Sequence, residues 1–387
     1  MTRRLSLFGA TGSVGQSTLD LVRRDGEGWR VSVLTANSDA AELAKLALEF
    51  RPDLVVIADE ARHDELKAAL SGTNIGVAAG AKALADAATL PTDLVLAAIV
   101  GTAGLAPTMA ALEAGHDVAL ANKESLVSAG ELMIAAAQRS GATILPIDSE
   151  HNAIFQCLAG GRIDQVRRII LTASGGPFRS MSAAGMAAVT PAQAVAHPNW
   201  SMGAKISVDS ATMMNKGLEL IEAHHLFPVG LDRIEILVHP QSVIHSLVEY
   251  VDCSTLAQLG SPDMRIPIAS ALAWPQRMAT PCAPLDLATI GRLDFEAPDE
   301  VRFPATALCR AAIAEGGTRP AQLNAANEVA VAAFLAGRIS FPAIVDTVRR
   351  VMDAEAPPAP AALHDIFSVD VASRAAAQHF VDHYEHV

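Results

Sequence analysis

Short apolar runs alternate with amphipathic segments along the first 150 residues. Apolar runs predict strands, and apolar residues spaced three and four apart predict helices. The predicted strands cover residues 5–9, 30–35, 54–58, 94–100, 118–121 and 142–147, and the predicted helices cover 18–24, 39–50, 63–70 and 107–114. Strands that alternate with helices form a parallel sheet covered on both faces. We therefore expect an α/β fold in this part of the chain.

The pattern changes beyond residue 148. Apolar runs at 168–172, 234–239 and 243–251 are mixed with helical stretches, which predicts an α+β domain. Prolines gather between 275 and 304, as in an irregular connector, and the remainder is alanine-rich and helical in pattern. We predict one domain over 1–148, a second over 149–274, a linker over 275–299 and a helical domain over 300–387.

The composition predicts a compact protein of two or three domains. Of the 387 residues, 51% are apolar and 18% are charged, and the net charge is -13. This acidic charge argues against non-specific nucleic-acid binding. The uncharged stretch 94–112 contains Gly101, Gly104 and Pro107, which predict a strand, a turn and a helix in place of a membrane span.

The cysteines and the N-terminal residues indicate a compartment. Cys157, Cys253, Cys282 and Cys309 lie far apart, with no short spacing typical of zinc or of a redox dithiol. Residues 1–4 lead directly into an apolar run, without the apolar segment and cleavage site of a signal peptide. We therefore expect a reducing, cytoplasmic location and no membrane association.

A glycine turn, Gly9-Ala-Thr-Gly12-Ser-Val-Gly15, stands between the first predicted strand and the first predicted helix. Glycines there let the backbone approach a pyrophosphate, and N–H groups at the helix start stabilise its charge. A plain tight turn is the alternative, but this placement favours dinucleotide binding. The second strand ends at Thr35-Ala-Asn-Ser38 without an acid for the ribose of NAD, which favours NADP, although Asp39 follows closely.

Two carboxylates, Asp148 and Glu150, follow the last strand of the first part and point to the same face of an extended segment. Glu219 offers a third oxygen ligand. Oxygen ligands without cysteine favour magnesium or manganese. Alternatively, Ser149 caps a helix over 152–158 and the acids stabilise its positive end. Both interpretations stay open on spacing alone.

The segment 205–222 gathers hydroxyl, amide, amine and carboxylate groups. If a helix begins near Ser210, Asn215 and Lys216 lie four and three residues before Glu219 and are its neighbours on the helix surface. This mixture suits a charged, oxygen-rich ligand. A solvated helix face with a Lys–Glu pair and a serine cap remains the alternative.

Several other polar residues are candidates. Ser174-Gly-Gly-Pro177 is a loop by default and an anion-binding turn as the alternative. His197 stands three residues before Trp200, which pairs a possible acid or base with an aromatic flap, although a lone histidine is more often structural. His239 and His245 flank an apolar strand, and we interpret them as structural.

Lys123 is better placed than most lysines. It follows the predicted strand that ends at Ala121, and ligands of doubly wound sheets bind at the carboxyl ends of strands. Lys123 is therefore a candidate for a ligand contact.

Taken together, these motifs closely resemble the 1-deoxy-D-xylulose 5-phosphate reductoisomerase family. The resemblance rests on Gly9–Gly15, Ala121–Val127, Pro146–Asn152, Thr172–Phe178, His197–Met202, Lys205–Glu219 and Leu323-Asn-Ala-Ala-Asn-Glu-Val329, in order along nearly the whole chain. One departure is Ala10, where the family often has serine.

The resemblance implies an NADPH-dependent enzyme of the non-mevalonate isoprenoid pathway. Such an enzyme uses Mg²⁺ or Mn²⁺, rearranges 1-deoxy-D-xylulose 5-phosphate and reduces the product to 2-C-methyl-D-erythritol 4-phosphate. The resemblance also implies a homodimer. The domains would be a Rossmann-like NADPH-binding domain over 1–148, an α+β catalytic domain over 149–274 with a flexible loop over 174–204, and a C-terminal helical domain.

The resemblance assigns roles to residues. The implied metal ligands are Asp148, Glu150 and Glu219. The implied substrate-binding residues are Ser174, His197, Ser210, Asn215, Lys216 and Glu219. Lys123, Ser149, Glu150, His197 and Trp200 would be the catalytic set, with Trp200 on the flap. The implied NADPH contacts are Thr11, Gly12, Ser13, Val14, Ala36, Asn37, Asn122, Glu124 and Gly203.

Two alternatives belong to other classes. A semialdehyde-type dehydrogenase also begins with such a glycine turn but needs a thiolate nucleophile. Cys157 is the only cysteine near the polar cluster, and its apolar surroundings predict that it is buried and inert. A non-enzymatic NADP-sensing regulator would not require three carboxylates beside a phosphate site.

Overall fold

The computed structural model describes residues 2–196, 200, 203–354 and 356–384. The chain folds into two compact units. The first comprises Met1–Ser125, Glu131–Asn152 and Met264–Cys282, and the second comprises Leu126–Gly130, Ala153–Asp263 and Ala283–Val387. The four ranges predicted from the sequence (1–148, 149–274, 275–299 and 300–387) were assigned by function, and that division stays a prediction.

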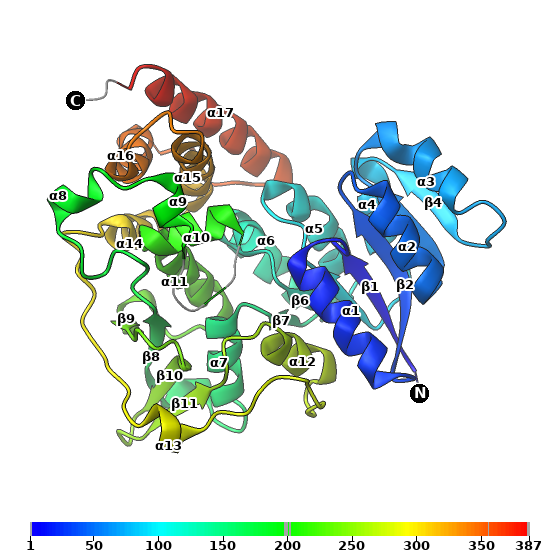
Figure 1. Ribbon diagram of the computed structural model, residues 1–387, viewed down its shortest axis with the longest axis horizontal. Coiled ribbons are helices and arrows are strands. Elements are labelled where there is room, and N and C mark those ends of the chain that lie inside the picture. Colours follow the sequence, from blue (N-terminus) through cyan, green and yellow to red (C-terminus); the bar gives the residue numbers. More distant parts are fainter. Residues whose placement is uncertain (1, 197–199, 201–202, 355, 385–387) are drawn as a thin grey trace. The chain divides into compact units, whose positions relative to one another are not determined.

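Seven parallel strands form the sheet of the first unit, in the order β4-β3-β2-β1-β5-β6-β7 (Figure 1). The strands are β1 (Arg3–Phe8), β2 (Trp29–Ala36), β3 (Leu54–Ile57), β4 (Gly76–Ala79), β5 (Leu94–Ala97), β6 (Val118–Leu120) and β7 (Ile144–Pro146). Most of their apolar side chains are buried, because helices cover parallel sheets on both faces. The predicted α/β class is confirmed.

The helices of this unit follow the strands in turn. They are α1 (Ser13–Asp25), α2 (Ala40–Phe50), α3 (His63–Ala69), α4 (Ala81–Ala88), α5 (Leu105–Glu113) and most of α6 (Lys123–Ser140). A further helix, α12 (Arg265–Ala273), comes from much later in the chain. Its Arg265 binds Asp20 of α1 at 3.0 Å, which ties this distant segment to the unit.

The order of the strands sets the position of the candidate site. From β1 the chain runs outward through β2, β3 and β4, and it then returns to β5 on the other side of β1. Ligands of doubly wound sheets bind at the carboxyl ends of the strands where the order reverses. The glycine turn after β1 and the loops after β5 and β6 lie at this edge.

Strand β4 and helix α4 were not among the predicted elements. Gly76-Val-Ala-Ala79 has only one side chain larger than alanine, so its hydrophobic pattern is weak. Its strand conformation depends on pairing with β3, which begins at Leu54 opposite Gly76. The hydrophobic pattern of a segment does not show that the segment will pair with a strand elsewhere in the chain.

The second unit contains a four-stranded sheet in the order β11-β10-β8-β9. Its strands are β8 (Val166–Ala173), β9 (Ile234–Val238), β10 (Ile244–Tyr250) and β11 (Thr255–Leu259). β8 and β9 are parallel and the other pairs are antiparallel, as an α+β arrangement allows. The sequence pattern did not separate β11 from the preceding residues.

Helices surround this sheet. They are α7 (Ser149–Cys157, whose first residues belong to the first unit), α8 (Ala183–Met186), α9 (Pro191–Ala194), α10 (Ala204–Ala211), α11 (Met214–Leu226), α13 (Leu287–Ile290), α14 (Ala305–Glu315), α15 (Arg319–Leu335), α16 (Phe341–Met352) and α17 (Leu363–Asp382). Short 3-10 turns cover Glu60–Arg62, Thr102–Gly104, Ile163–Gln165 and Leu231–Arg233. None of the described helices has the length and apolar character that a membrane span requires.

Helix α11 lies in the core of the second unit. Its Leu218 and Ile221 belong to a buried apolar cluster with Leu171 of β8 and Cys309 of α14. A Cβ atom added at Gly217 would lie 2.5 Å from the Cys309 sulfur, so the glycine allows α11 and α14 to approach closely. This packing fixes the helix that carries three of the predicted site residues.

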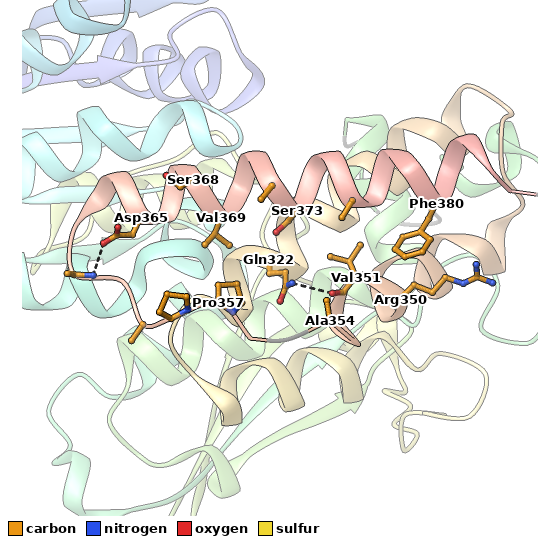
Figure 2. A pocket seen from close by; sticks show the side chains of 15 residues that line it. Gln322, Arg350, Val351, Ala354, Pro357, Asp365, Ser368, Val369, Ser373 and Phe380 are labelled. Carbon is orange, nitrogen blue, oxygen red and sulfur yellow. Dashed lines mark hydrogen bonds between the residues drawn. The ribbon is translucent and has the colours of Figure 1, made fainter.

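A cavity of about 700 Å³ opens between α15, α16 and α17 (Figure 2). Val351, Val369 and Phe380 give it apolar walls, and Arg350 lies near Phe380. At the start of α17, Asp365 accepts hydrogen bonds from the N–H groups of residues 361 and 362, at 2.8 and 2.9 Å. None of the residues lining this cavity is a predicted site residue.

The glycine turn generates a stability prediction. A Cβ atom at Gly15 would lie 2.3 Å from the Gly9 carbonyl oxygen, whereas a Cβ atom at Gly12 would lie 3.5 Å from that oxygen. We expect Gly15→Ala to lower the free energy of unfolding by about 1–3 kcal/mol through overpacking. Gly12→Ala should change it much less, because Gly12 has a backbone conformation open to alanine. Urea denaturation of both variants measures the difference, and equal losses would contradict it.

Candidate active site

The turn after β1 forms a cradle lined by backbone. Gly9 has a φ of 92°, in the left-handed region that favours glycine, and a Cβ atom there would lie 2.6 Å from the Ala98 carbonyl oxygen. Gly12 precedes α1, and no side chain caps that helix. The first N–H groups of α1 can therefore bind an anion without competition from a capping side chain. Thr11, Ser13 and the half-buried Val14 complete the turn.

The end of β2 holds the next predicted cofactor contacts. Ala36 is its last residue and is buried, and the following Asn37 is exposed. Asp39, which had weakened the preference for NADP, caps α2 by accepting a hydrogen bond from the Glu42 N–H at 3.0 Å. The carboxylate of Asp39 therefore caps a helix, which was not predicted from the sequence.

Asn122 ties together the loops at the ends of β5 and β6. Its buried amide group donates hydrogen bonds to the carbonyls of Ile99 and Gly101, the latter at 3.0 Å, and its Oδ1 accepts from the Ser125 N–H at 2.9 Å. The side chain thus shapes the edge of the sheet. A contact of Asn122 with the cofactor stays a prediction, as does one of the buried Glu124.

Lys123 and Asp148 form an ion pair in the first unit. Lys123 is the first residue of α6, and its Nζ lies 2.8 Å from Asp148 Oδ2. His151 Nδ1 lies 3.4 Å from the other oxygen of Asp148. Burial alone would raise the pKa of the Asp148 carboxyl, but Lys123 and His151 outweigh burial and hold this pKa well below its usual range. Asp148 is therefore ionised and able to bind a cation.

Sequence reasoning missed His151. The signal was its position three residues after Asp148, which is the spacing of neighbours on one helix face. Its side chain is fully buried. His151 therefore helps to orient the carboxylate of Asp148.

Ser149 and Glu150 begin α7. The Ser149 hydroxyl donates a hydrogen bond to Glu150 Oε2 at 2.5 Å, and the Glu150 N–H donates to Asp148 Oδ1 at 3.3 Å. Helix α7 thus starts at Ser149, three residues earlier than the predicted 152–158 helix. The alternative in which Ser149 caps a helix over 152–158 does not hold, because Ser149 is itself the first residue of α7.

In the second unit, two helices replace the single predicted helix start near Ser210. Helix α10 ends at Ala211 and α11 begins at Met214, and Met213 between them has a φ of 63°. A left-handed methionine carries no sequence signal, so the break was not predicted. The neighbour relations on α11 are nevertheless as predicted, because residues 215–219 all lie after the break.

Glu219 receives two neighbours from its own helix. The Asn215 amide donates a hydrogen bond to Oε1, and the Lys216 ammonium donates to Oε2. The side chains of Lys216 and Glu219 are 4% and 1% exposed, so this is a buried ion pair and not a solvated surface pair. The alternative of a solvated face is wrong here.

The loop after β8 lies against the end of α10. A Cβ atom at Gly176, whose φ is 68°, would lie 2.7 Å from the Ser210 carbonyl oxygen. The Gly176 N–H also donates a hydrogen bond to the Ser174 hydroxyl at 3.1 Å. The loop that carries Ser174 therefore packs against the backbone of Ser210.

The predicted loop 174–204 contains the short helices α8 and α9, and Gly203 directly precedes α10. His197 lies outside the described residues. The ring of Trp200 lies 6.0 Å from that of His245, measured between centroids. Burial is the main cause that lowers the pKa of His245 to about 4, and the charge of Lys216 contributes. His245 is therefore neutral at pH 7.

Cys157 does not fit the role of a nucleophile. The residue is buried, and burial raises the pKa of its thiol to about 11. The thiolate that attacks an aldehyde is disfavoured at neutral pH. This result agrees with the expectation from its apolar surroundings.

Family models of one enzyme match most of the chain. The model described as 1-deoxy-D-xylulose 5-phosphate reductoisomerase matches residues 5–130. The model of the C-terminal domain of that enzyme matches 144–227, and a model described as DXP reductoisomerase C-terminal domain matches 259–376.

Individual proteins agree with these models. The 1-deoxy-D-xylulose 5-phosphate reductoisomerase of Zymomonas mobilis subsp. mobilis is 57% identical over 372 residues, which are 96% of either chain. That of Caulobacter vibrioides is 56% identical over 91% of this chain and 88% of its own length.

Two solved structures extend the similarity to the fold. The Zymomonas mobilis enzyme in complex with NADPH has a TM-score of 0.95 at 54% identity, covering 99% of this chain and 100% of that one. A DOX-P reductoisomerase in complex with NADPH, fosmidomycin and magnesium has a TM-score of 0.93 at 43% identity, covering 98% of each chain.

The low pKa of His245 predicts a pH effect on stability. Between pH 6.5 and about 4 the unfolded chain protonates this histidine and the folded chain does not, so stability falls as the pH falls through that window. One such proton contributes up to about 1.4 kcal/mol per pH unit. His245→Gln should reduce the slope of unfolding free energy against pH by up to this amount. Urea denaturation at several pH values measures it, and an unchanged slope would refute the buried neutral state.

Proposed function

The chain belongs to the 1-deoxy-D-xylulose 5-phosphate reductoisomerase family, and we propose on that basis how its residues carry out the reaction. The chain converts 1-deoxy-D-xylulose 5-phosphate to 2-C-methyl-D-erythritol 4-phosphate with NADPH and a divalent metal ion. The family resemblance stated from the sequence is confirmed. The observation that carries this function is similarity to an NADPH-bound reductoisomerase over 99% of the chain.

The cradle after β1 suits NADPH. Gly9 and Gly15 leave no room for side chains, and the uncapped start of α1 offers N–H groups to a pyrophosphate. We assign cofactor contacts to Thr11, Gly12, Ser13 and Val14 in this turn. The further assigned contacts are Ala36, Asn37, Asn122, Glu124 and Gly203. When bound, NADPH supplies the hydride that reduces the aldehyde formed by the rearrangement.

Asp148, Glu150 and Glu219 suit a hard divalent ion. All three are carboxylates, and Lys123 keeps Asp148 ionised. An all-oxygen set matches magnesium or manganese. When bound, the ion polarises the substrate carbonyl and stabilises negative charge on adjacent oxygens.

Ser174, Ser210, Asn215 and Lys216 form the proposed phosphate site. The loop that carries the first packs against the backbone of the second, and the other two start α11. The phosphate undergoes no reaction, but binding it orients the sugar and contributes binding energy that can order the site. Lys216 donates to Glu219, so the proposed phosphate and metal sites share one helical turn.

The remaining catalytic assignments concern the reacting end of the sugar. We assign Lys123, Ser149 and Glu150 to it from the first unit, together with His197 and the flap residue Trp200. The Ser149 hydroxyl is a donor beside Glu150 and can reorient toward a substrate oxygen. Closure of a flap would exclude water from the rearranging sugar.

A direct assay tests the function. Purified protein is mixed with NADPH and 1-deoxy-D-xylulose 5-phosphate, with magnesium, with manganese or without metal. NADPH absorbance should fall only when the sugar phosphate and a metal are both present. NADPH consumption without the sugar phosphate, or none under any condition, would contradict the proposal.

We also propose a homodimer located in the cytoplasm that does not bind nucleic acid. The edge strand β11 carries Leu256, which is half exposed, and an exposed apolar edge strand is a common place for a second chain to pair. Light scattering should give twice the 40.3 kDa chain mass, and the mass of one chain would contradict the dimer.

The metal and phosphate assignments predict different kinetic effects. Asp148→Asn should abolish turnover with either metal while the dissociation constant of NADPH stays within about twofold, because the change removes a ligand of the ion and leaves the glycine turn intact.

Lys216→Ala should mainly raise the KM for the sugar phosphate, by about tenfold or more for a lost charged hydrogen bond. Steady-state kinetics and NADPH fluorescence titration measure both. Normal turnover in the first variant, or an unchanged KM in the second, removes the corresponding assignment.

A further inference from the structure

The segment Leu323–Val329 resembles the family but takes no part in the function described so far. It lies within α15, and its Asn327 is fully buried. The Asn327 amide donates a hydrogen bond to Asp209 Oδ1 at 2.8 Å. Asp209 belongs to α10 and directly precedes Ser210 of the proposed phosphate site. A residue 118 positions away therefore holds the neighbour of a phosphate ligand.

Asp209 is a buried carboxylate with two partners. It is 1% exposed, and Lys205, one turn earlier on α10, places its ammonium 2.9 Å from Oδ2. Burying a charge is costly even when it is paired, and apolar residues of similar volume often hold two helices together as well or better. A role in stability alone therefore does not explain this group. Directional hydrogen bonds do fix the rotation of one helix against another.

The rotation of α10 matters for the phosphate site. Successive helix residues point about 100° apart, so the rotation that turns Asp209 toward α15 also sets the direction of Ser210. The Ser210 carbonyl lies against Gly176, in the loop that carries Ser174. It also accepts a hydrogen bond from the Met213 N–H at 3.2 Å, at the left-handed residue from which α11 departs. A turned α10 would therefore move the hydroxyls and the start of α11.

The adjacent residue on α15 offers a matched comparison. Glu328 binds Arg374 of α17, which also binds Asp370 at 2.7 Å. These ion pairs are less buried than Asp209, and they join α15 to α17. They provide a control for general damage to the helical bundle.

We propose that Asn327 is a positioning residue for the phosphate site, acting through Asp209 to fix the rotation of α10. The C-terminal helices thereby set the affinity for the phosphate end of the substrate. This inference rests on the proposed role of Ser210 and Lys216 in phosphate binding.

The test uses steady-state kinetics of the full-length protein. Asn327→Leu removes the hydrogen-bond donor at similar volume. It should raise the KM for 1-deoxy-D-xylulose 5-phosphate about tenfold, and the inhibition constant of inorganic phosphate by the same factor. The kcat should fall by a smaller factor than the KM for the sugar phosphate rises. The KM for NADPH should change less than about twofold, because most of the assigned NADPH contacts lie in the first unit.

Two further variants separate positioning from stability. Arg374→Met should lower the melting temperature without changing the KM for the sugar phosphate. The second is a double variant that combines Asn327→Asp with Asp209→Asn, so that one amide and one carboxylate still face each other. It should return the KM to within about threefold of the wild-type value.

The outcomes distinguish this inference from the proposed function. No NADPH consumption by the wild-type protein would contradict the function itself. An active wild type with an unchanged KM in Asn327→Leu would overturn the inference alone, as would an equal rise in KM in Arg374→Met. If Asn327→Leu does not fold, the double variant Asn327→Asp with Asp209→Asn provides the test. A tenfold rise in the KM for the sugar phosphate in that double variant would also overturn the inference.

Discussion

The ion pair between Lys216 and Glu219 is the interaction on which the account of the site depends. Both side chains are buried, and Asn215 donates to the same carboxylate. A buried pair of this kind is expensive to form, and removal of either partner leaves an uncompensated charge. The pair holds the proposed phosphate-binding cation and the proposed metal-binding carboxylate within one turn of α11. In the proposed function, a single rigid helix thereby binds both ends of the sugar phosphate.

That rigidity depends on the packing around α11. Gly217 lets the helix approach α14, and Leu218 lies in the core, so the polar groups have little freedom to move. The left-handed Met213 then turns the chain from α10 into α11. In the first unit, Lys123 and His151 hold the pKa of the Asp148 carboxyl well below its usual range despite its burial.

The sequence predicted the parts of the structure that depend on local patterns. Apolar periodicity located six of the seven strands in the parallel sheet, and the spacing of Asn215, Lys216 and Glu219 correctly predicted their contacts. It missed features that depend on distant contacts. The strand at Gly76 exists because it pairs with β3, and the break at Met213 depends on the surrounding packing.

The sequence also did not predict which polar side chains hold distant segments of the chain together. The side chain of Asn122 joins two loops, a use that its sequence position did not predict, and its contact with the cofactor stays a prediction. The contact between Asp209 and Asn327 spans 118 residues and has no periodic signal. The family resemblance supplied the roles of the remaining site residues, because spacing alone left the metal and helix-cap interpretations equally open.

The most direct test of the account is a crystal structure with manganese and 1-deoxy-D-xylulose 5-phosphate bound. Anomalous scattering locates the manganese independently of the protein density. The account predicts one peak bound by oxygens of Asp148, Glu150 and Glu219, with the substrate phosphate held by Ser174, Ser210, Asn215 and Lys216. A manganese peak away from these carboxylates, or a phosphate bound elsewhere, would contradict the division of α11 between the two ends of the substrate.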